Sequence, residues 1–443
     1  MKTPVSDFIE RYAKSGTSRF HMPGHKGKGP LGIEKYDITE IDGADVLSTA
    51  KGIIEESEKN LTALYGSGKS FYITQGSSTA ICAMLSMIKK PEREKTYVLA
   101  ARNVHKAFVH ALALLDIEAE WIMTKTANGV LSCDITAFDV EATLSSSEGK
   151  YSAVYLTSPD YLGQIGDIEE ISKVCHKYNV PLLVDNAHGA YLKFLKESMH
   201  PIDKGADICC DSAHKTLPVL TGGAYLHITK RAEDFIGTAR EKIALFSSTS
   251  PSYLTMKSLD MCNLYIKRNF GRELSDCIAK IKEVKALIVK KGFVLLESEP
   301  LKIVINAAKS GYTGIELAKM MRKEKMEAEF SDDDYLVLMI SPQNTPRDFR
   351  RLKKFFCEIN AKSEIKRSFT HLPYPVRKIS AREAFFAKSE VTETRLAKGK
   401  ICASVTVSCP PAVPIVVSGE VITEEVIEAL LYYGIDEIKT VSD

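Results

Sequence analysis

Neither an excess of charge of one sign nor a long apolar run occurs in this sequence. Its 59 lysines and arginines nearly balance 57 aspartates and glutamates, which leaves a formal net charge of +2. This balance excludes the basic surface that nucleic-acid-binding proteins and proteins of acidic membranes need. Met1–Phe8 lacks the apolar core of a signal peptide, and no stretch approaches the length of a membrane span. We therefore expect neither a nucleic-acid partner nor a membrane location.

The ten cysteines include no Cys-x-x-Cys pair, and they are scattered along the chain. This distribution argues against a disulfide framework and favours reduced thiols, so we expect a cytoplasmic protein. With 443 residues, of which 44% are hydrophobic and 26% charged, the chain has the composition of a soluble globular protein. Its length predicts more than one domain.

Short apolar runs alternate with helix-like periods between about residue 70 and residue 230. The pattern predicts strands over 71–74, 96–100, 152–157, 181–185, 206–210 and 224–228, and helices over 80–89, 108–115 and 168–178. Such alternation is typical of an α/β fold with a mostly parallel sheet and helices on both faces. Ligands of such sheets bind beyond the carboxyl ends of the strands.

The pattern changes after residue 270. Helices over 272–291, 314–323 and 346–356 and strands over 293–296, 302–306 and 335–340 predict a smaller α+β domain. We divide the chain into an N-terminal arm (1–45), a large domain (46–270), the small domain (271–360) and a C-terminal segment (361–443), with a final helix over 424–433.

The most informative pair of residues is Asp185, at the end of a buried strand, and Lys215, just after another. Pyridoxal phosphate needs this combination. The lysine amine condenses with the cofactor aldehyde, and the carboxylate keeps the pyridine nitrogen protonated so that the ring accepts electrons. The alternative for Asp185 is a cap of the following turn.

Other polar residues follow predicted strand ends and can reach the same crevice. Ser77 and Ser78 open a helix after Gly76, where free backbone N–H groups and hydroxyls would hold a phosphate, although a plain helix cap has the same sequence. His105 either lies against the cofactor ring or is structural. His214 is a candidate for contacting the phosphate or substrate and for moving protons.

A metal site is not expected. His21 and His25 have ligand-like spacing, but Pro23 and Gly24 between them prevent a shared helix face. Asp332–Asp334 precedes a strand, and we interpret it as a solvated turn. His188, three residues after Asp185, is either a neighbour that orients Asp185 or a structural histidine.

Nearly the whole chain resembles the ornithine/lysine/arginine decarboxylases of the fold-type-I pyridoxal-phosphate enzymes. Several segments carry the resemblance: Phe20–Gly27, Asp37–Glu40, Ala63–Phe71, Thr74–Thr79, Asn103–Lys106, Val184–Gly189, Ser212–Thr216 and Ser248–Tyr253. The chain resembles the short form of the family, which lacks the extra N-terminal domain of the large members.

The resemblance implies a large domain like that of aspartate aminotransferase, a C-terminal decarboxylase-type segment, and a homodimer with active sites at the subunit interface. It implies that Lys215, His214 and His105 are catalytic. It also implies that the cofactor is bound by Lys215, Asp185, His105, Ser77, Ser78, Ser212, His214 and Ala187.

The chain departs from the family at several positions. Asn186 stands where a glutamate is usual, and Ser404, Ser408 and Cys409 stand where Glu, Pro and Tyr are expected. Loss of a carboxylate near the site would weaken recognition of a cationic side chain.

Three functions follow from these observations. The first is α-decarboxylation of an amino acid, with arginine, lysine or ornithine as the expected substrate and a polyamine-type amine as the product. The second is a different pyridoxal-phosphate reaction, such as aminotransfer, for which Arg377, Arg382 or Arg395 would have to hold the substrate carboxylate. The third is a non-catalytic regulatory homologue, which the altered 402–409 segment favours and the intact Lys215 and Asp185 oppose.

Overall fold

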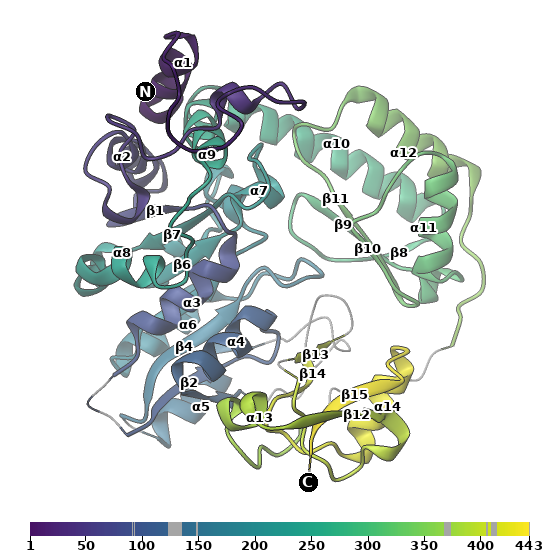
Figure 1. Ribbon diagram of the computed structural model, residues 1–443. Helices are drawn as coiled ribbons and strands as arrows, with labels where there is room; N and C mark the ends of the chain where they lie inside the picture. Colours follow the sequence, from purple (N-terminus) through teal and green to yellow (C-terminus); the bar gives the residue numbers. More distant parts are fainter. Residues whose placement is uncertain are drawn as a thin grey trace.

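The computed structural model describes residues 1–90, 92, 94–122, 135–147, 149–366, 374–404, 406–408 and 414–442. It contains a seven-stranded sheet, a four-stranded sheet and two small two-stranded sheets in these parts of the chain (Figure 1). None of the described helices has the length and apolarity that a membrane crossing requires.

The seven-stranded sheet has the order β1-β7-β6-β5-β4-β2-β3, and only β7 runs against its neighbours. The strands are β1 (Lys69–Ile73), β2 (Thr96–Ala100), β3 (Ile117–Trp121), β4 (Tyr151–Thr157), β5 (Leu182–Asp185), β6 (Ile208–Asp211) and β7 (Ala224–Ile228). The central strands β4, β5 and β6 are almost fully buried, as expected for parallel strands covered on both faces. The predicted α/β class with a mostly parallel sheet is confirmed.

Helices cover both faces of this sheet (Figure 1). One face packs against α3 (Ser77–Met87), α4 (Lys106–Leu115) and α8 (Ile236–Ala244). The other packs against α5 (Ala137–Ser145) and α6 (Ile168–Lys177) at one end and α2 (Ile53–Tyr65) and α9 (Tyr253–Tyr265) at the other. All but one of the residues of α3 are buried, so this helix is packed on almost every side. The packing holds its N-terminus in a fixed position.

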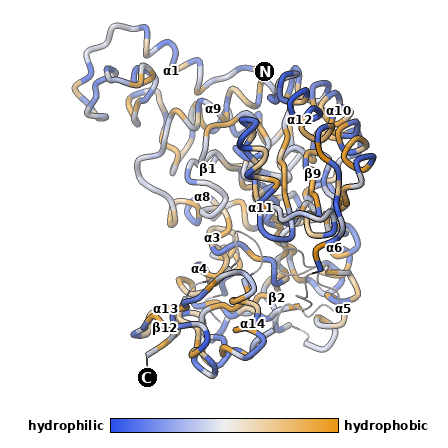
Figure 2. Tube along the Cα trace, turned by 90° about the vertical axis from the view of Figure 1, so that its right-hand side faces the viewer, coloured by the Kyte–Doolittle hydropathy of each residue, from blue (hydrophilic) through white to orange (hydrophobic). Residues whose placement is uncertain are grey.

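The second sheet is antiparallel with the order β10-β11-β9-β8. Its elements are β8 (Val294–Leu296), β9 (Lys302–Asn306), β10 (Phe330–Ser331), β11 (Tyr335–Met339), α10 (Gly271–Lys290), α11 (Gly314–Lys323) and α12 (Pro346–Glu358). Figure 2 shows β9 as hydrophobic, whereas α10 and α12 alternate between hydrophilic and hydrophobic stretches. The smaller α+β domain is therefore present, although the helix that enters it is continuous from α9 through a π-helical stretch, Ile266–Phe270, into α10.

The Asp332–Asp334 turn joins β10 to β11, as a hairpin, but the prediction of a solvated turn is wrong for Asp332. Its carboxylate accepts the backbone N–H groups of Asp334 (2.9 Å) and Tyr335 (2.6 Å). Burial raises the pKa of this carboxyl group to about 6. The side chain therefore closes the hairpin rather than facing water.

The C-terminal part packs against both preceding parts. It contains α13 (Ala381–Phe386), β12 (Ser389–Glu393), β13 (Thr406–Ser408), β14 (Pro414–Val417), α14 (Glu424–Tyr432) and β15 (Glu437–Val441). The remaining elements are α1 (Pro4–Lys14) and short 3-10 helices at Glu34–Tyr36, Leu47–Thr49, Ala190–Phe194, Pro201–Lys204, Lys230–Phe235, Ala308–Ser310 and Thr394–Leu396.

A buried ion pair fixes the C-terminal part to the large sheet. Arg102, just after β2, and Glu420 are 0% and 1% exposed, and their side chains make two hydrogen bonds of 2.5 and 2.7 Å. Arg102 also donates to the carbonyls of Pro414 and Ile415. The next residue, Asn103, lines the cavity described below, so the C-terminal part supports one wall of that cavity.

Candidate active site

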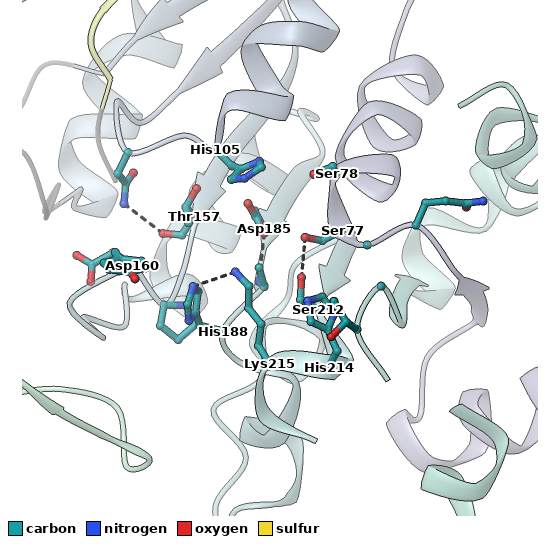
Figure 3. A pocket seen from close by; sticks show the side chains of 18 residues that line it. Ser77, Ser78, His105, Thr157, Asp160, Asp185, His188, Ser212, His214 and Lys215 are labelled. Atoms are coloured by element: carbon teal, nitrogen blue, oxygen red, sulfur yellow. Dashed lines mark hydrogen bonds between the residues drawn. The ribbon is translucent and has the colours of Figure 1, made fainter. Parts of the chain in front are cut away.

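One cavity of about 350 Å³ lies at the carboxyl ends of the strands of the large sheet. All the residues that the sequence predicts as catalytic or cofactor-binding line it: Ser77, Ser78, His105, Asp185, Ala187, Ser212, His214 and Lys215. Figure 3 shows Lys215 extending between His188 on one side and Asp185 on the other, with the serines beyond Asp185. The fold thus brings the predicted residues together, and their roles are proposals developed below.

Asp185 is the last residue of β5 and is only 2% exposed. Its carboxylate accepts a hydrogen bond from the backbone N–H of Ala187 (3.1 Å) and a long one from the hydroxyl of Tyr155 (3.4 Å). Burial, with the negative charge of Asp185, raises the pKa of Tyr155 well above its ordinary value, so the phenol remains a proton donor. No cation pairs with this buried carboxylate in the part of the chain that the structure describes, and a charge so placed calls for a cationic ligand.

Lys215 lies in the one-turn helix α7 (Ala213–Thr216), which follows β6. Burial lowers the pKa of its amine, and the charge of Asp185 acts in the opposite direction. More of the amine is therefore neutral at a given pH than in a solvated lysine, and a neutral amine is the nucleophilic form.

His188 is the residue whose importance the sequence left undecided. Its Nε2 atom lies 3.1 Å from Nζ of Lys215, and the ring is only 6% exposed. Burial, together with the charges of Lys302 and Lys215, lowers the pKa of His188 well below its ordinary value. The neutral ring can accept a hydrogen bond from the Lys215 amine. Nδ1 has no partner among the described residues. The Asp-x-x-His spacing was the only signal in the sequence.

His105 opens α4, and its Nδ1 accepts the backbone N–H of Ala107 (3.2 Å). Burial lowers the pKa of this histidine, against the effect of Asp185. This hydrogen bond, which caps the N-terminus of α4, holds the flat, neutral ring of His105 at the cavity wall. His105 is therefore a helix cap and a wall of the cavity at once.

The far end of the cavity is built for an anion. Ser212 donates a hydrogen bond to the hydroxyl of Ser77 (2.7 Å), at the N-terminus of α3. The backbone N–H groups of Ser77 and Ser78 have no acceptor in the described ranges, as is usual in the first turn of a helix. Gly76 has a φ of +80°, and the space where a Cβ would project is open. Backbone donors, hydroxyls and the helix dipole together suit a phosphate.

His214 faces this end of the cavity from α7. Its Nδ1 lies 3.0 Å from the carbonyl oxygen of Gly223, to which it donates, so Nε2 is left as the acceptor. Burial lowers the pKa of His214, partly offset by this hydrogen bond. The ring is therefore a neutral proton acceptor at neutral pH.

Asn186 is held by a buried polar cluster behind the cavity. Its side-chain amide donates to Asp211 (2.6 Å), whose carboxylate also contacts His200 (3.0 Å) and His227 (3.2 Å). Burial alone would raise the pKa of Asp211, but the two histidines hold it below the usual range. A glutamate at position 186 would place a second negative charge beside the Asp211 carboxylate. The repulsion between the two charges gives a physical reason for the asparagine.

The arginines considered for an aminotransferase do not line the cavity. Arg377 pairs with Glu118, and Arg382 donates to the carbonyls of Ala113 and Leu114 (3.1 Å each). Arg395 is exposed on the C-terminal part. The two N-terminal histidines also have other partners, since His21 lies 2.6 Å from the hydroxyl of Tyr12 and His25 lies 3.2 Å from Asp37.

The altered C-terminal segment is only partly described. The carbonyl of Ser404 accepts a hydrogen bond from the hydroxyl of Ser418. Ser408 is the last residue of β13. Cys409 lies outside the described residues.

Solved structures of lysine decarboxylases share this fold. The constitutive lysine decarboxylase of Escherichia coli superimposes with a TM-score of 0.79 at 17% identity, over 100% of this chain and 82% of the other. The Francisella novicida lysine decarboxylase LdcF gives a TM-score of 0.80 at 18% identity, over 99% and 81% of the two chains.

Sequence comparisons extend over almost the full length. The chain is 28% identical to the uncharacterized protein YaaO of Bacillus subtilis, over 97% of this chain and 94% of YaaO. It is 27% identical to the arginine decarboxylase of the same organism, over 96% and 92%. Residues 3–307 match the family model described as Orn/Lys/Arg decarboxylase, major domain. On this match the chain belongs to the Orn/Lys/Arg decarboxylase family.

Proposed function

We propose that the protein catalyses the pyridoxal-phosphate-dependent α-decarboxylation of an amino acid with a basic side chain, namely arginine, lysine or ornithine. The products would be carbon dioxide and a polyamine-type amine. The observation that carries the proposal is the placement of an unpaired, buried Asp185 and of Lys215 in one cavity whose far end suits an anion. Membership of the family supports the reaction class.

The residues of the cavity suit three groups of the cofactor, namely its ring nitrogen, its aldehyde and its phosphate. Asp185 would hold the protonated ring nitrogen, and Nζ of Lys215 would bind the aldehyde carbon. Ser77, Ser78 and Ser212 would hold the phosphate with the N-terminus of α3. When bound, pyridoxal phosphate supplies an electron sink for the electrons left on Cα as the carboxylate leaves.

The remaining residues orient the reactants and move protons. His105 and Ala187, which both line the cavity, would contact the cofactor ring and would help to hold the substrate in one orientation for loss of its carboxylate. His188 accepts a hydrogen bond from Nζ of Lys215 and orients that amine. After loss of carbon dioxide, Lys215 would return a proton to Cα, or His214 would do so once its Nε2 atom has taken up a proton.

The reaction does not require an arginine clamp, because the carboxylate is the leaving group. No arginine lines the cavity among the described residues, which favours decarboxylation over aminotransfer. The resemblance and the exposed apolar side chains of the N-terminal arm support a homodimer with active sites at the subunit interface. These side chains are Phe20, Met22, Leu31 and Ile33. Eight described cysteines are free thiols, which supports a cytoplasmic location.

The test uses purified protein loaded with pyridoxal phosphate and offered arginine, lysine and ornithine in turn. Release of carbon dioxide and the matching amine, abolished by Lys215→Ala, is the expected result. A yellow holoprotein that releases no carbon dioxide from any of the three would contradict a basic substrate. A protein that fails to take up the cofactor would instead support the regulatory alternative.

A further inference from the structure

A carboxylate of the small domain approaches the cavity through Tyr161. The ring of Tyr161 lines the cavity, and its hydroxyl donates to Oε1 of Glu329 at 3.3 Å. Glu329 directly precedes β10, and its backbone N–H donates to the carbonyl of Val337 (3.0 Å). The carboxylate is therefore mounted on the β10–β11 hairpin and meets the large domain at the cavity wall.

Tyr161 is held in a fixed orientation. Its ring meets His188 edge-on, with centroids 5.6 Å apart, and meets Phe330 edge-on at 5.3 Å. Nζ of Lys302 donates to the backbone carbonyl of Tyr161 (3.1 Å). Since His188 also contacts Nζ of Lys215, only an imidazole and a phenol ring separate the reactive amine from Glu329.

Glu329 is an exposed carboxylate, and no cation pairs with it in the described part of the chain. Glu299, by contrast, lies 2.9 Å from Nζ of Lys302. Asp185 is buried at the opposite side of Lys215 and is assigned to the cofactor. The pKa of Lys215 is lowered mainly by burial, and the negative charge of Glu329, like that of Asp185, acts in the opposite direction.

We propose that Glu329, held by the hydroxyl of Tyr161, binds the distal cationic group of the substrate side chain. A carboxylate accepts charge-assisted hydrogen bonds from an ammonium or guanidinium group. The inference rests on the proposed function, and it names the residue that selects a basic side chain. The family is expected to have a glutamate at position 404, where this chain has the uncharged Ser404. Glu329 would supply the negative charge that is missing there.

The first test is the variant Glu329→Gln in the cofactor-loaded protein, with the best of the three basic amino acids as substrate. We expect KM to rise roughly tenfold or more, the usual value of a hydrogen bond to a charged group, with kcat changed less than about threefold. Tyr161→Phe should raise KM less, because it removes only the group that positions Glu329. The matched control is Glu327→Gln, an exposed neighbour that pairs with Arg322 (3.0 Å) and should leave both constants unchanged.

A second measurement separates this inference from the proposed function. Calorimetric binding of the amine product to the wild-type holoprotein and to Glu329→Gln reports recognition of the cation without turnover. Weaker binding of the amine by the variant supports the inference. Wild-type turnover of a basic amino acid, with KM and amine affinity unchanged in Glu329→Gln, overturns the inference and leaves the decarboxylase in place. If the wild-type protein neither turns over nor binds any basic compound, both proposals fail.

Discussion

The amine of Lys215 lies 3.1 Å from Nε2 of His188, and both side chains line the same cavity. Because burial lowers the pKa values of both groups, a larger fraction of each is neutral at a given pH than in a solvated lysine or histidine. The imidazole then accepts an N–H of the amine, and the lone pair of the amine is directed elsewhere into the cavity.

This contact predicts that His188 governs how fast the apoprotein takes up pyridoxal phosphate. His188→Leu removes the acceptor and should slow uptake by roughly ten- to a hundredfold, since a misplaced nucleophile reacts slowly. His188→Gln carries an amide close to the position of Nε2 and should retain most of the rate. The growth of visible absorbance after mixing measures uptake without any turnover. Equal rates for the wild type and His188→Leu would show that the contact has no positioning role.

The cluster behind the cavity predicts the consequence of a charge at position 186. Asn186→Asp places a second buried carboxylate against Asp211 and should lower the free energy of unfolding by about 3–5 kcal/mol. Asn186→Ala removes the donor without adding charge and should cost about 1–3 kcal/mol. Chemical denaturation of the two variants measures the difference. A variant Asn186→Asp as stable as Asn186→Ala would mean that the two side chains do not face each other.

The Arg102–Glu420 pair predicts how the C-terminal part is attached. Arg102→Met leaves a buried carboxylate unpaired and should destabilise the protein by about 3–5 kcal/mol. The double variant Arg102→Met/Glu420→Gln should recover part of this loss. Limited proteolysis would reveal earlier cleavage in the C-terminal part of the single variant. The control is Arg382→Met, which loses hydrogen bonds to two carbonyls and a contact with the ring of Phe386 but breaks no ion pair in the described part of the chain.

Stability should decrease as the pH falls below about 6.5, the ordinary pKa of histidine. Burial lowers the pKa of five histidines, namely His105, His110, His188, His214 and His227. In this range the unfolded chain therefore binds more protons than the folded protein, which favours unfolding.

Buried carboxyl groups have the opposite effect on stability over part of the same pH range. Burial raises the pKa values of Asp260 and Asp332 to about 6 and raises that of Glu58, so these groups take up protons first in the folded protein. We expect the effect of the five histidines on the free energy of unfolding to exceed that of these carboxyl groups. Melting temperatures at about pH 7.5 and about pH 5 measure the balance. A flat profile or a higher melting temperature at the lower pH would contradict it, and Asp332→Asn should make the fall steeper.

Much of the fold was predictable because its central strands are continuous apolar runs. The predicted strand over 302–306 and helix over 314–323 coincide with β9 and α11. The edge strand β3, Ile117–Trp121, was missed because acidic residues alternate with apolar ones in it, which weakens the signal of a buried parallel strand. Its place in the sheet depends on pairing with β2, which no local pattern reveals.

The predicted site residues share one cavity because each follows a strand end, and that rule needs only local sequence. The contacts made by residues distant in the chain could not be predicted in this way. Glu329 reaches Tyr161 across 168 positions of sequence, and only the packing of the small sheet against the large one brings them together. The partner of Lys215 likewise depends on the path of the turn after β5.

The ion pair behind the cavity wall also limits how early this wall can form while the ribosome synthesises the chain. Arg102 and Glu420 are separated by 318 positions. At about 5–20 residues per second, the ribosome needs on the order of 15 to 60 s to add the second partner after the first. Throughout that interval the guanidinium group of Arg102 lacks the Glu420 carboxylate with which it pairs in the folded protein. This wall of the cavity can therefore reach its final form only after Glu420 has been added to the nascent chain.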